Sequence, residues 1–453
     1  MPPPPAPRSS SQSICLVVPC NNKQQQQQQQ QPPSTMPVEV GQNDGRVLGR
    51  FKRIRLPWAI YTCTFISCFI IAGVLLSIDR RQTRYSIIFD ARSAGSRMHL
   101  FKLEWRAGLW FLLGEYFERS APGIGFYGEA PRQAAKSLSR MLRNATRKIP
   151  TSYHHVTRLS LGATTALTEL ANNRSALLLN TLRKLFYGKA TSSFQNGTVD
   201  ILGGLDKGFY SWAALSFLLN ETLPESTVAS LELGNATAQV AFRPPENGSL
   251  NERWSPSTFR LLDIDIALCV NNADDTGLFL ARDKILRIND SDYQSPCMAE
   301  KLPAEETYQA PTLQKASSSS KLQTSPHQVN YTSCYFECLE VVKQSAVEAV
   351  PPLPGYTLFA TGQFYSLAAQ VGMIPKTATR GTISPDDFKR QAQTACELII
   401  DVQDTLCVDL TYVYALLNDG YMLPGNTTIN VVRQISGIDV GWPLGMALSQ
   451  LYG

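Results

Sequence analysis

The pattern of hydrophobic and polar positions divides this chain into three parts. Residues 1–56 begin with a tail rich in Pro, Ser and Gln that has no apolar period, so we expect disorder there. Residues 57–78 form an apolar run without Lys, Arg, Asp or Glu, long enough to cross a bilayer as one helix. From residue 85 onward, short apolar runs alternate with segments of helical spacing, and this alternation predicts an α/β fold.

The period of each apolar segment predicts its secondary structure. Strands are expected at 86–90, 98–103, 156–161, 199–202, 228–233 and 238–242. Helices are expected at 131–148, 165–186, 208–219, 333–347, 386–403, 408–419 and 441–450. Residues 305–329 are poor in apolar side chains and predict an exposed loop between folded parts.

Charges and glycosylation signals predict the orientation of the apolar run. Basic residues precede the run more often than they follow it, a moderate bias that favours a cytoplasmic N-terminus. Nine Asn-X-Ser/Thr sequons all follow the run, at Asn144, Asn173, Asn196, Asn220, Asn235, Asn247, Asn289, Asn330 and Asn426. We therefore expect a signal-anchor glycoprotein that crosses the membrane once, with its globular region in the Golgi or endoplasmic reticulum lumen or outside the cell.

Composition and cysteine count argue against a nucleic-acid-binding protein and against a structural zinc site. The 453 residues are 43% hydrophobic and carry a net charge of +5, much of it in the first 84 residues. The globular part therefore shows no nucleic-acid-binding surface. Six cysteines follow the apolar run, and an even number in an oxidising compartment indicates disulfides, although six cysteines allow many pairings. With no CxxC pair and only four His, a structural zinc site is not expected.

A duplicated strand–loop–strand pattern carries the candidate chemistry. One strand ends at Asp90 in FDARSAGS, and another ends at Glu232 in LELGNAT. Small residues after each acid let backbone N–H groups approach an anion, and the acid can hold a metal directly or through water. Either loop alone could be an ordinary hairpin turn. Because the pattern recurs about 140 residues later, we predict two facing loops that clasp a polyphosphate.

Several ordered motifs resemble those of the apyrase-type nucleoside di- and triphosphatase family. The first motif, usually DAGSTGTR, is similar to YSIIFDARSAGSRMHLFKLEW, and the second, usually ATAGLR, is similar to LSLGATTALTEL. The third, usually GTDEGxxAW, resembles GGLDKGFYSW, and the fourth, usually LDLGGGSTQIAF, resembles LELGNATAQVAF. The C-terminal segments CVDLTYVYALLNDGYMLP and GIDVGWPLGMAL extend the likeness to the chain end. Within this family, the sequence most resembles the nucleoside-diphosphatase branch of the secretory pathway.

The resemblance implies the fold of the actin, sugar-kinase and heat-shock-ATPase superfamily. Two lobes with duplicated ribonuclease-H-like cores would hold the nucleotide in the cleft between them. Lobe I would comprise 85–202 with the returning segment 433–453, and lobe II would comprise 203–432. The resemblance also implies two disulfides and leaves a third candidate pair: Cys297 with Cys334, Cys396 with Cys407, and Cys269 with Cys338.

The family's reaction is metal-assisted attack of water on the terminal phosphate of a nucleoside diphosphate or triphosphate. The resemblance implies that Asp90 and Glu232 hold Mg²⁺ or Ca²⁺. It implies phosphate and nucleotide contacts from Ser93, Ala94, Gly95, Ser96, Arg97, Ala163, Thr164, Gly234, Asn235, Ala236, Thr237 and Gln239. Tyr365 matches an aromatic residue that stacks on the base, although a single Tyr is more often a core residue.

The sequence departs from the family pattern at five positions. Lys207 replaces the glutamate that acts as general base, and loss of a general base typically costs about 10²- to 10⁴-fold in rate. Arg92 replaces a loop glycine, and Asn235 replaces another and creates a sequon inside the loop. Glu232 replaces an aspartate, and Thr168 replaces an arginine.

Three functions are compatible with the sequence, and the resemblance leads us to expect the first. In the first, the chain hydrolyses nucleoside diphosphates or triphosphates, with Asp206 as a substitute base or Lys207 acting with a lowered pKa. In the second, it is a pseudoenzyme that binds a nucleotide, with Arg92 and Lys207 as countercharges in place of metal. In the third, it is a glycoprotein scaffold whose cleft is closed.

Overall fold

The computed structural model describes most of the chain beyond residue 81. The described residues are 14–15, 65, 67–69, 82–92, 95–106, 108–163, 174–220, 227–245, 250, 252–287, 290, 292–299, 329–353, 355–398 and 405–451. The expected membrane span 57–78 and the loop 305–329 lie almost entirely outside them. Among the helices in this described part, none combines the length and the apolar character that a membrane crossing requires.

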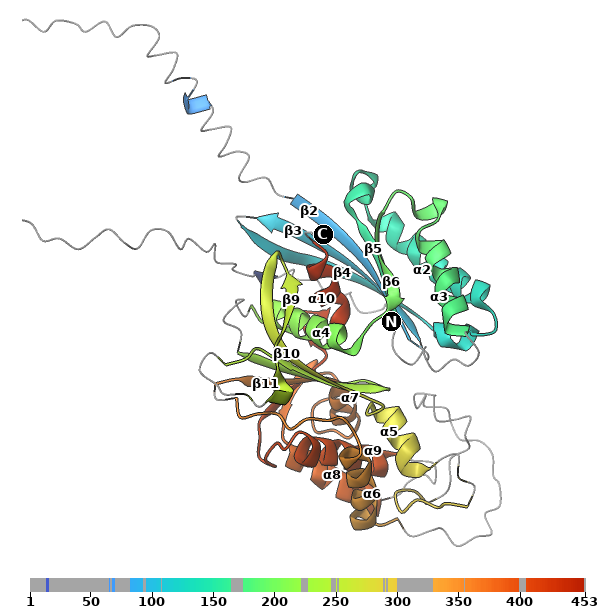
Figure 1. Cartoon of the computed structure of the whole chain (residues 1–453), viewed down its shortest axis with the longest axis vertical. Coiled ribbons are helices and arrows are strands. Elements are labelled where there is room, and N and C mark those ends of the chain that lie inside the picture. The colour runs from blue at the N-terminus through green and yellow to red at the C-terminus, as the bar shows by residue number, and fades with distance from the viewer. Residues whose placement is uncertain are drawn as a thin grey trace, which may run out of the picture.

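The first sheet has six strands in the order β1-β4-β3-β2-β5-β6 (Figure 1). These are β1 (Ile14–Cys15), β2 (Gln82–Ala91), β3 (Ser96–Arg106), β4 (Leu109–Ser120), β5 (Arg158–Ala163) and β6 (Gln195–Ile201). β2, β3 and β4 form an antiparallel meander, whereas β5 runs parallel to β2 and β6 runs parallel to β5. The sequence predicts no strand in the first 45 residues, so the two-residue edge strand β1 is an addition.

Two helices cover one face of the first sheet. They are α2 (Pro131–Lys148) and α3 (Arg174–Phe186), which lie together beside β5 and β6 (Figure 1). α2 buries Ala134, Leu138, Met141, Leu142 and Ala145. This spacing of three and four residues puts the apolar side chains on one side of the helix, as predicted from the sequence.

The second sheet has seven strands in the order β12-β13-β11-β7-β8-β10-β9. They are β7 (Val228–Leu233), β8 (Thr237–Phe242), β9 (Ser257–Leu261), β10 (Ile264–Asp274), β11 (Thr357–Gly362), β12 (Arg380–Ile383) and β13 (Ile429–Val432). β7 and β8 form an antiparallel hairpin and β11 runs parallel to β7, so this sheet repeats the arrangement of β2, β3 and β5. The predicted duplication is therefore present in the fold. A separate two-stranded sheet pairs β14 (Gln434–Ile435) with β15 (Ile438–Asp439).

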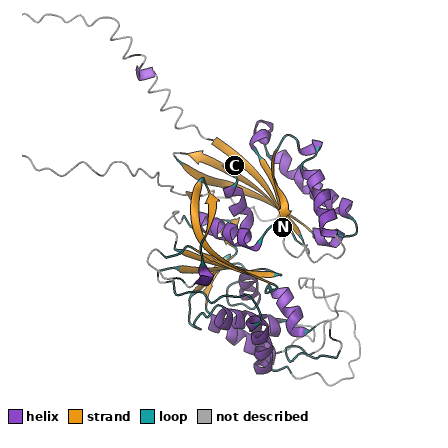
Figure 2. Ribbon diagram, viewed as in Figure 1, coloured by secondary structure: helices purple, strands orange, loops and turns teal. Residues whose placement is uncertain are grey.

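Five helices pack on the outer side of the second sheet (Figure 2). They are α5 (Leu278–Leu286), α6 (Tyr331–Lys343), α7 (Gln363–Gln370), α8 (Pro385–Glu397) and α9 (Leu406–Ala415). The sequence located α6, α8 and α9 but not α5 or α7. The missed helices have nine and eight residues, too short for an apolar period to stand out.

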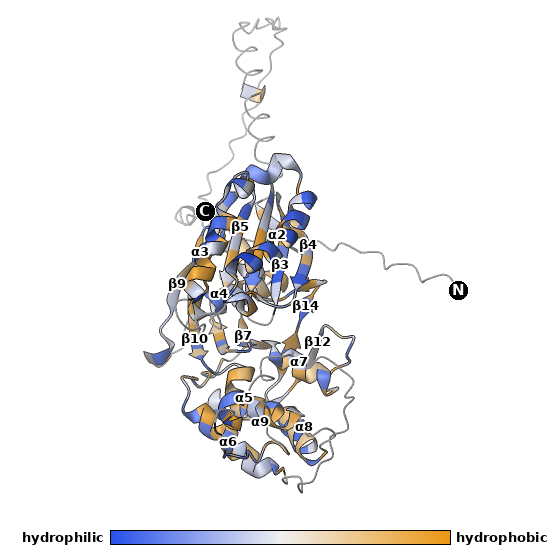
Figure 3. Cartoon of the chain, turned by 90° about the vertical axis from the view of Figure 1, so that its right-hand side faces the viewer, coloured by the Kyte–Doolittle hydropathy of each residue, from blue (hydrophilic) through white to orange (hydrophobic). Residues whose placement is uncertain are grey.

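Two helices lie between the sheets. They are α4 (Gly204–Leu218) and α10 (Trp442–Ser449), and their buried side chains form one core with residues of both sheets. Figure 3 shows α4 between β3 and β5 of the first sheet and β7 of the second. Beyond the exposed start of α4, most residues of both helices are buried, and the helices are apolar around most of their circumference. Their contact is close: a Cβ on Gly445 would lie 1.9 Å from the carbonyl oxygen of Tyr210, so only glycine fits there.

The structure confirms two disulfides and corrects the third pairing. Cys297–Cys334 and Cys396–Cys407 are bonded. Cys269 and Cys338 are buried free thiols, so the expectation that they pair is wrong. Their surroundings explain this, because the Cys269 thiol donates to the carbonyl of Trp254 at 3.1 Å, whereas Cys338 lies on α6 with its sulfur toward α9.

Candidate functional site

The two predicted turns line one cavity between the sheets. The cavity has a volume of about 500 Å³. The first sheet contributes Asp90 and Arg92, and the β7–β8 turn contributes Glu232, Gly234 and Asn235. The end of β2 and the end of β7 therefore face the same space, as the duplicated pattern predicts.

The carboxylate of Asp90 is fully buried and already has a cationic partner. Nε of Arg92 donates to Oδ2 of Asp90 at 2.6 Å, and Nη2 of Arg92 lies 2.6 Å from the same oxygen. Burial raises the pKa of Asp90, but the charge and hydrogen bond of Arg92 and the charge of Arg97 outweigh it, so that this pKa lies below its ordinary value. The second oxygen, Oδ1, has no hydrogen-bond partner among the described residues.

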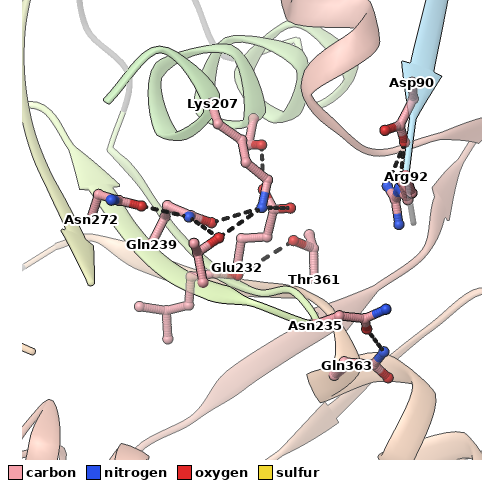
Figure 4. Close-up of polar contacts among 12 residues, drawn as sticks. Asp90, Arg92, Lys207, Glu232, Asn235, Gln239, Asn272, Thr361 and Gln363 are labelled. Carbon is pink, nitrogen blue, oxygen red and sulfur yellow. Dashed lines mark hydrogen bonds and ion pairs between the residues drawn. The ribbon is translucent and has the colours of Figure 1, made fainter. Parts of the chain in front are cut away.

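The carboxylate of Glu232 is likewise neutralised within the chain (Figure 4). Nζ of Lys207 lies 3.0 Å from Oε1 of Glu232, and Ser211 donates to Oε2 at 2.5 Å. Lys207 also donates to Oε1 of Gln239 at 3.0 Å and to the hydroxyl of Thr237 at 3.5 Å. The ammonium group therefore has three partners in a buried position.

The position of Lys207 follows from local structure. Lys207 lies in the first turn of α4, which begins at Gly204, and is itself not among the residues that line the cavity. The amide of Gln239 is held by two further bonds, because its Nε2 donates to Thr237 at 2.6 Å and to Asn272 at 2.8 Å. These bonds turn the carbonyl oxygen of Gln239 toward Lys207, so the ammonium is held from both β7 and β8.

Asp206 does not reach this site. It lines a different cavity, together with Arg158, Tyr210 and Arg260. Successive residues of an α-helix point about 100° apart, so Asp206 and Lys207 face different sides of α4. Burial raises the pKa of Asp206, but the structure places its carboxylate away from the two turns.

The acids of this site do not fit a divalent cation in their present arrangement. A metal held by both carboxylates would have to displace Arg92 from Asp90 and Lys207 from Glu232. Positive groups so close to the site would also repel a dication. The described part of the chain contains one other cluster with metal-ligand spacing, Cys297, Cys334 and Cys338, and two of these thiols are used in a disulfide.

The other predicted contact residues divide into three groups. Ser93, Ala94 and Thr164 lie outside the described residues. Arg97, Gly234, Asn235 and Tyr365 line the cavity. Gly95, Ser96, Ala163, Ala236, Thr237 and Gln239 lie at the ends of the strands or in the β7–β8 turn, and are not among the residues that line it.

Tyr365 and Asn235 have structural partners within the cavity wall. The Tyr365 ring is only 6% exposed, and its hydroxyl donates to the carbonyl of Ala378 at 2.6 Å. The Arg433 guanidinium lies over this ring, 5.5 Å from the centroid. Gln363 donates from Nε2 to Oδ1 of Asn235 at 2.7 Å, which joins the β7–β8 turn to the start of α7.

The cavity has more charged groups of both signs than the sequence predicts, because the acids Glu115 and Asp439 line it together with two further arginines. Arg119 on β4 and Arg433 after β13 line it in addition to Arg92 and Arg97. Residues at the starts of α7 and α10 line it as well, and a helix N-terminus favours an anion. The sequence offers one signal for Arg119, since it lies directly opposite Arg97 in the β3–β4 pairing, but β4 itself was not predicted.

Comparison with known proteins identifies the family. Residues 76–352 and 356–452 match the model of the GDA1/CD39 (nucleoside phosphatase) family. The chain belongs to this family. Its similarity to nucleoside phosphatases extends over the whole region in which the sequence motifs occur.

Individual GDA1/CD39 relatives are moderately similar. "Nucleoside diphosphate phosphatase ENTPD5" of Homo sapiens is 27% identical over 378 residues, which covers 80% of this chain and 86% of that protein. "Probable apyrase 2" of Oryza sativa subsp. japonica is 26% identical over 405 residues, covering 81% and 85%.

A solved structure of a nucleoside triphosphate hydrolase from Neospora caninum matches with a TM-score of 0.52 at 13% identity, covering 87% of this chain and 97% of that one. This likeness shows the fold, which is the two-lobed actin-like fold expected from the motifs.

Proposed function

We propose that this chain binds the phosphate groups of a nucleoside diphosphate or triphosphate through its own cations, and does not hydrolyse them by metal-assisted attack of water. The carrying observation is the 3.0 Å ion pair between Lys207 and Glu232, at the position of the family's general base. The ammonium of Lys207 cannot accept a proton from water while it is charged.

The arginines of the cavity wall support anion binding, against four carboxylates in the same wall, those of Asp90, Glu115, Glu232 and Asp439. Arg92, Arg97, Arg119 and Arg433 all line the cavity, and a guanidinium binds phosphate oxygens through a planar set of donors. Arg92 and Lys207 each sit against one acid, where the family places a metal between the acids. A phosphate chain would therefore meet fixed cations instead of a dication.

The competing function is the family's own activity, hydrolysis of nucleoside diphosphates or triphosphates with Mg²⁺ or Ca²⁺. Membership of the GDA1/CD39 family supports it. The position of Asp206 in a separate cavity speaks against that residue as a substitute base. We therefore favour binding without turnover.

We also propose the placement and the lobe boundaries expected from the sequence. The two disulfides favour an oxidising compartment, the secretory lumen or the cell exterior, with residues 57–78 as the membrane anchor. Lobe I would comprise 85–202 with 433–453, and lobe II would comprise 203–432. The packing of α10 against β2 supports a C-terminal segment that returns to lobe I, although α10 also packs against α4, which these boundaries assign to lobe II.

The test uses the glycosylated full-length chain, purified in detergent. Phosphate release is measured with nucleoside diphosphates and triphosphates in Mg²⁺ or Ca²⁺, and thermal stabilisation by the same nucleotides is measured in EDTA. We expect stabilisation in EDTA and no phosphate release above the enzyme-free blank. Metal-dependent release would establish the hydrolase, and the absence of both signals would leave the scaffold function.

A further inference from the structure

An exposed phenylalanine lines the cavity on the side of the first sheet. Phe117 on β4 is 37% exposed and shares the cavity wall with Arg97 and Arg119. One exposed aromatic ring is ordinary on a protein surface. This ring is unusual because it lies inside a cavity whose other walls are rich in charge.

The ring of Phe117 is supported from behind. The His99 ring lies 5.0 Å from it, and the Phe101 ring is stacked on His99 at 5.8 Å. Nδ1 of His99 is 2.6 Å from Oε1 of Glu115, and the other oxygen of Glu115 accepts from the backbone N–H of Asp439 at 3.3 Å. All three rings line the cavity, and the middle one, that of His99, is held in place by Glu115.

Tyr365 is poorly placed to receive a base. Its ring is 6% exposed, its hydroxyl is bonded to a backbone carbonyl, and Arg433 covers one face. A base could stack on this ring only after Arg433 moved away. Phe117 offers an open ring face without such a change.

The distance from the acids to Phe117 suits a nucleotide. Strand pairing places Asp90 opposite Arg97, and Arg97 opposite Arg119. Phe117 lies two residues further along β4 on the same side of the sheet as Arg119. With strands about 4.8 Å apart and a rise of about 3.4 Å per residue, its Cα lies roughly 12 Å from that of Asp90. The two arginines lie between these ends.

We infer that Phe117 is the platform on which the base of a bound nucleotide stacks, with its phosphate groups held near Asp90 and Glu232. This inference rests on the proposed function. It moves the base from the second sheet, where the family resemblance puts it at Tyr365, to the first. His99 and Glu115 act as positioning residues for the platform.

The test compares ligands that differ only in the presence of a base. Dissociation constants of ADP and UDP are measured by calorimetry in EDTA, with pyrophosphate and methyl diphosphate as base-free ligands. Phe117→Ala should weaken nucleotide binding by about 5-fold to 100-fold, the range found when an aromatic platform for a base is removed. Binding of the base-free ligands should not change, and Phe117→Trp should retain nucleotide binding.

Phe126→Ala is the matched control, since Phe126 is 73% exposed and does not line the cavity. It should leave every dissociation constant as in the wild type. The inference is overturned if Phe117→Ala weakens both ligand classes equally or neither. It is also overturned, with the proposed function intact, if wild-type protein binds methyl diphosphate as tightly as ADP. If the wild type binds none of the four ligands, both the proposed function and this inference are wrong.

Discussion

The ammonium nitrogen of Lys207 lies 3.0 Å from Oε1 of Glu232, and both side chains are about nine-tenths shielded from solvent. In the family motif the residue at 207 is an acid, which would repel Glu232 unless a cation lay between them. Here the cation belongs to the chain. On the correspondence that we propose between Lys207 and the family's general base, this residue replaces a proton acceptor and also supplies the positive charge that a metal would otherwise provide beside Glu232.

Lys207→Glu should restore what this pairing removes. Two carboxylates would face each other where the ion pair now lies, so we expect thermal stabilisation by Mg²⁺ and phosphate release from nucleoside diphosphates above the enzyme-free blank. Both are measured on the purified chain. Lys207→Gln removes the cation without adding an acid and should gain neither property. Equal gains in the two variants would show that the positive charge alone suppresses hydrolysis.

Arg92→Met should make the stability of the protein respond differently to pH. The pKa of Asp90 is lowered in the folded state from an ordinary value of 3.8, so its contribution is present above that value and is lost as the pH falls through the lower folded pKa. Without Arg92, burial raises the pKa of Asp90. We expect a loss of roughly 1–2 kcal/mol at pH 7, allowing for the partial exposure of Arg92.

Urea unfolding at a series of pH values checks this. The difference between wild type and Arg92→Met should shrink as the pH falls from the raised pKa of Asp90 in the variant, above 3.8, to the lowered pKa of Asp90 in the wild type, below 3.8. Adding Asp90→Asn to both proteins should abolish the pH dependence of the difference. A difference that stays constant with pH would contradict the assignment to Asp90.

Breaking the ion pair between Arg282 and Asp409 should strongly lower the free energy of unfolding. Two bonds of 2.7 Å join α5 to α9, and both side chains are almost fully buried. Arg282→Met leaves the carboxylate buried without its partner and should cost about 3–5 kcal/mol in the free energy of unfolding. The double variant with Asp409→Leu should recover much of this, because no unpaired charge remains. A double variant as unstable as Arg282→Met would refute the explanation.

Asn235 should carry no glycan in ligand-binding protein. Its side chain is bonded to Gln363 in the cavity wall, and a sugar there would fill the space where we place the phosphate groups. Glycopeptide mass spectrometry should find Asn235 unmodified. Asn426, which is exposed, is the internal comparison and should be occupied. High occupancy at Asn235 in protein that still binds nucleotides would contradict the site.

Much of the fold is local enough to be predicted. The strands that flank the two acids have continuous apolar runs, and α2 has its apolar residues at helical spacing, so the sequence identifies these elements and their order. The missed strand β4 lies near an edge of its sheet and, after its first four residues, has only partly buried and exposed positions, so its apolar alternation is weak. The two correct disulfide pairings were implied by the family resemblance. The third candidate pair, Cys269 with Cys338, is not bonded in the structure.

The composition of the cavity wall depends on contacts between segments far apart in the chain. The sequence itself shows the residue types at positions 90, 207 and 232. Compared with the family motif, it has a lysine at 207 in place of a glutamate. That Lys207 reaches Glu232 while Asp206 faces another cavity follows from the rotation of α4 against β7. Arg119, Arg433 and Phe117 enter the same wall through strand pairing and through the return of the C-terminal segment, relationships that neighbouring residues in sequence do not encode.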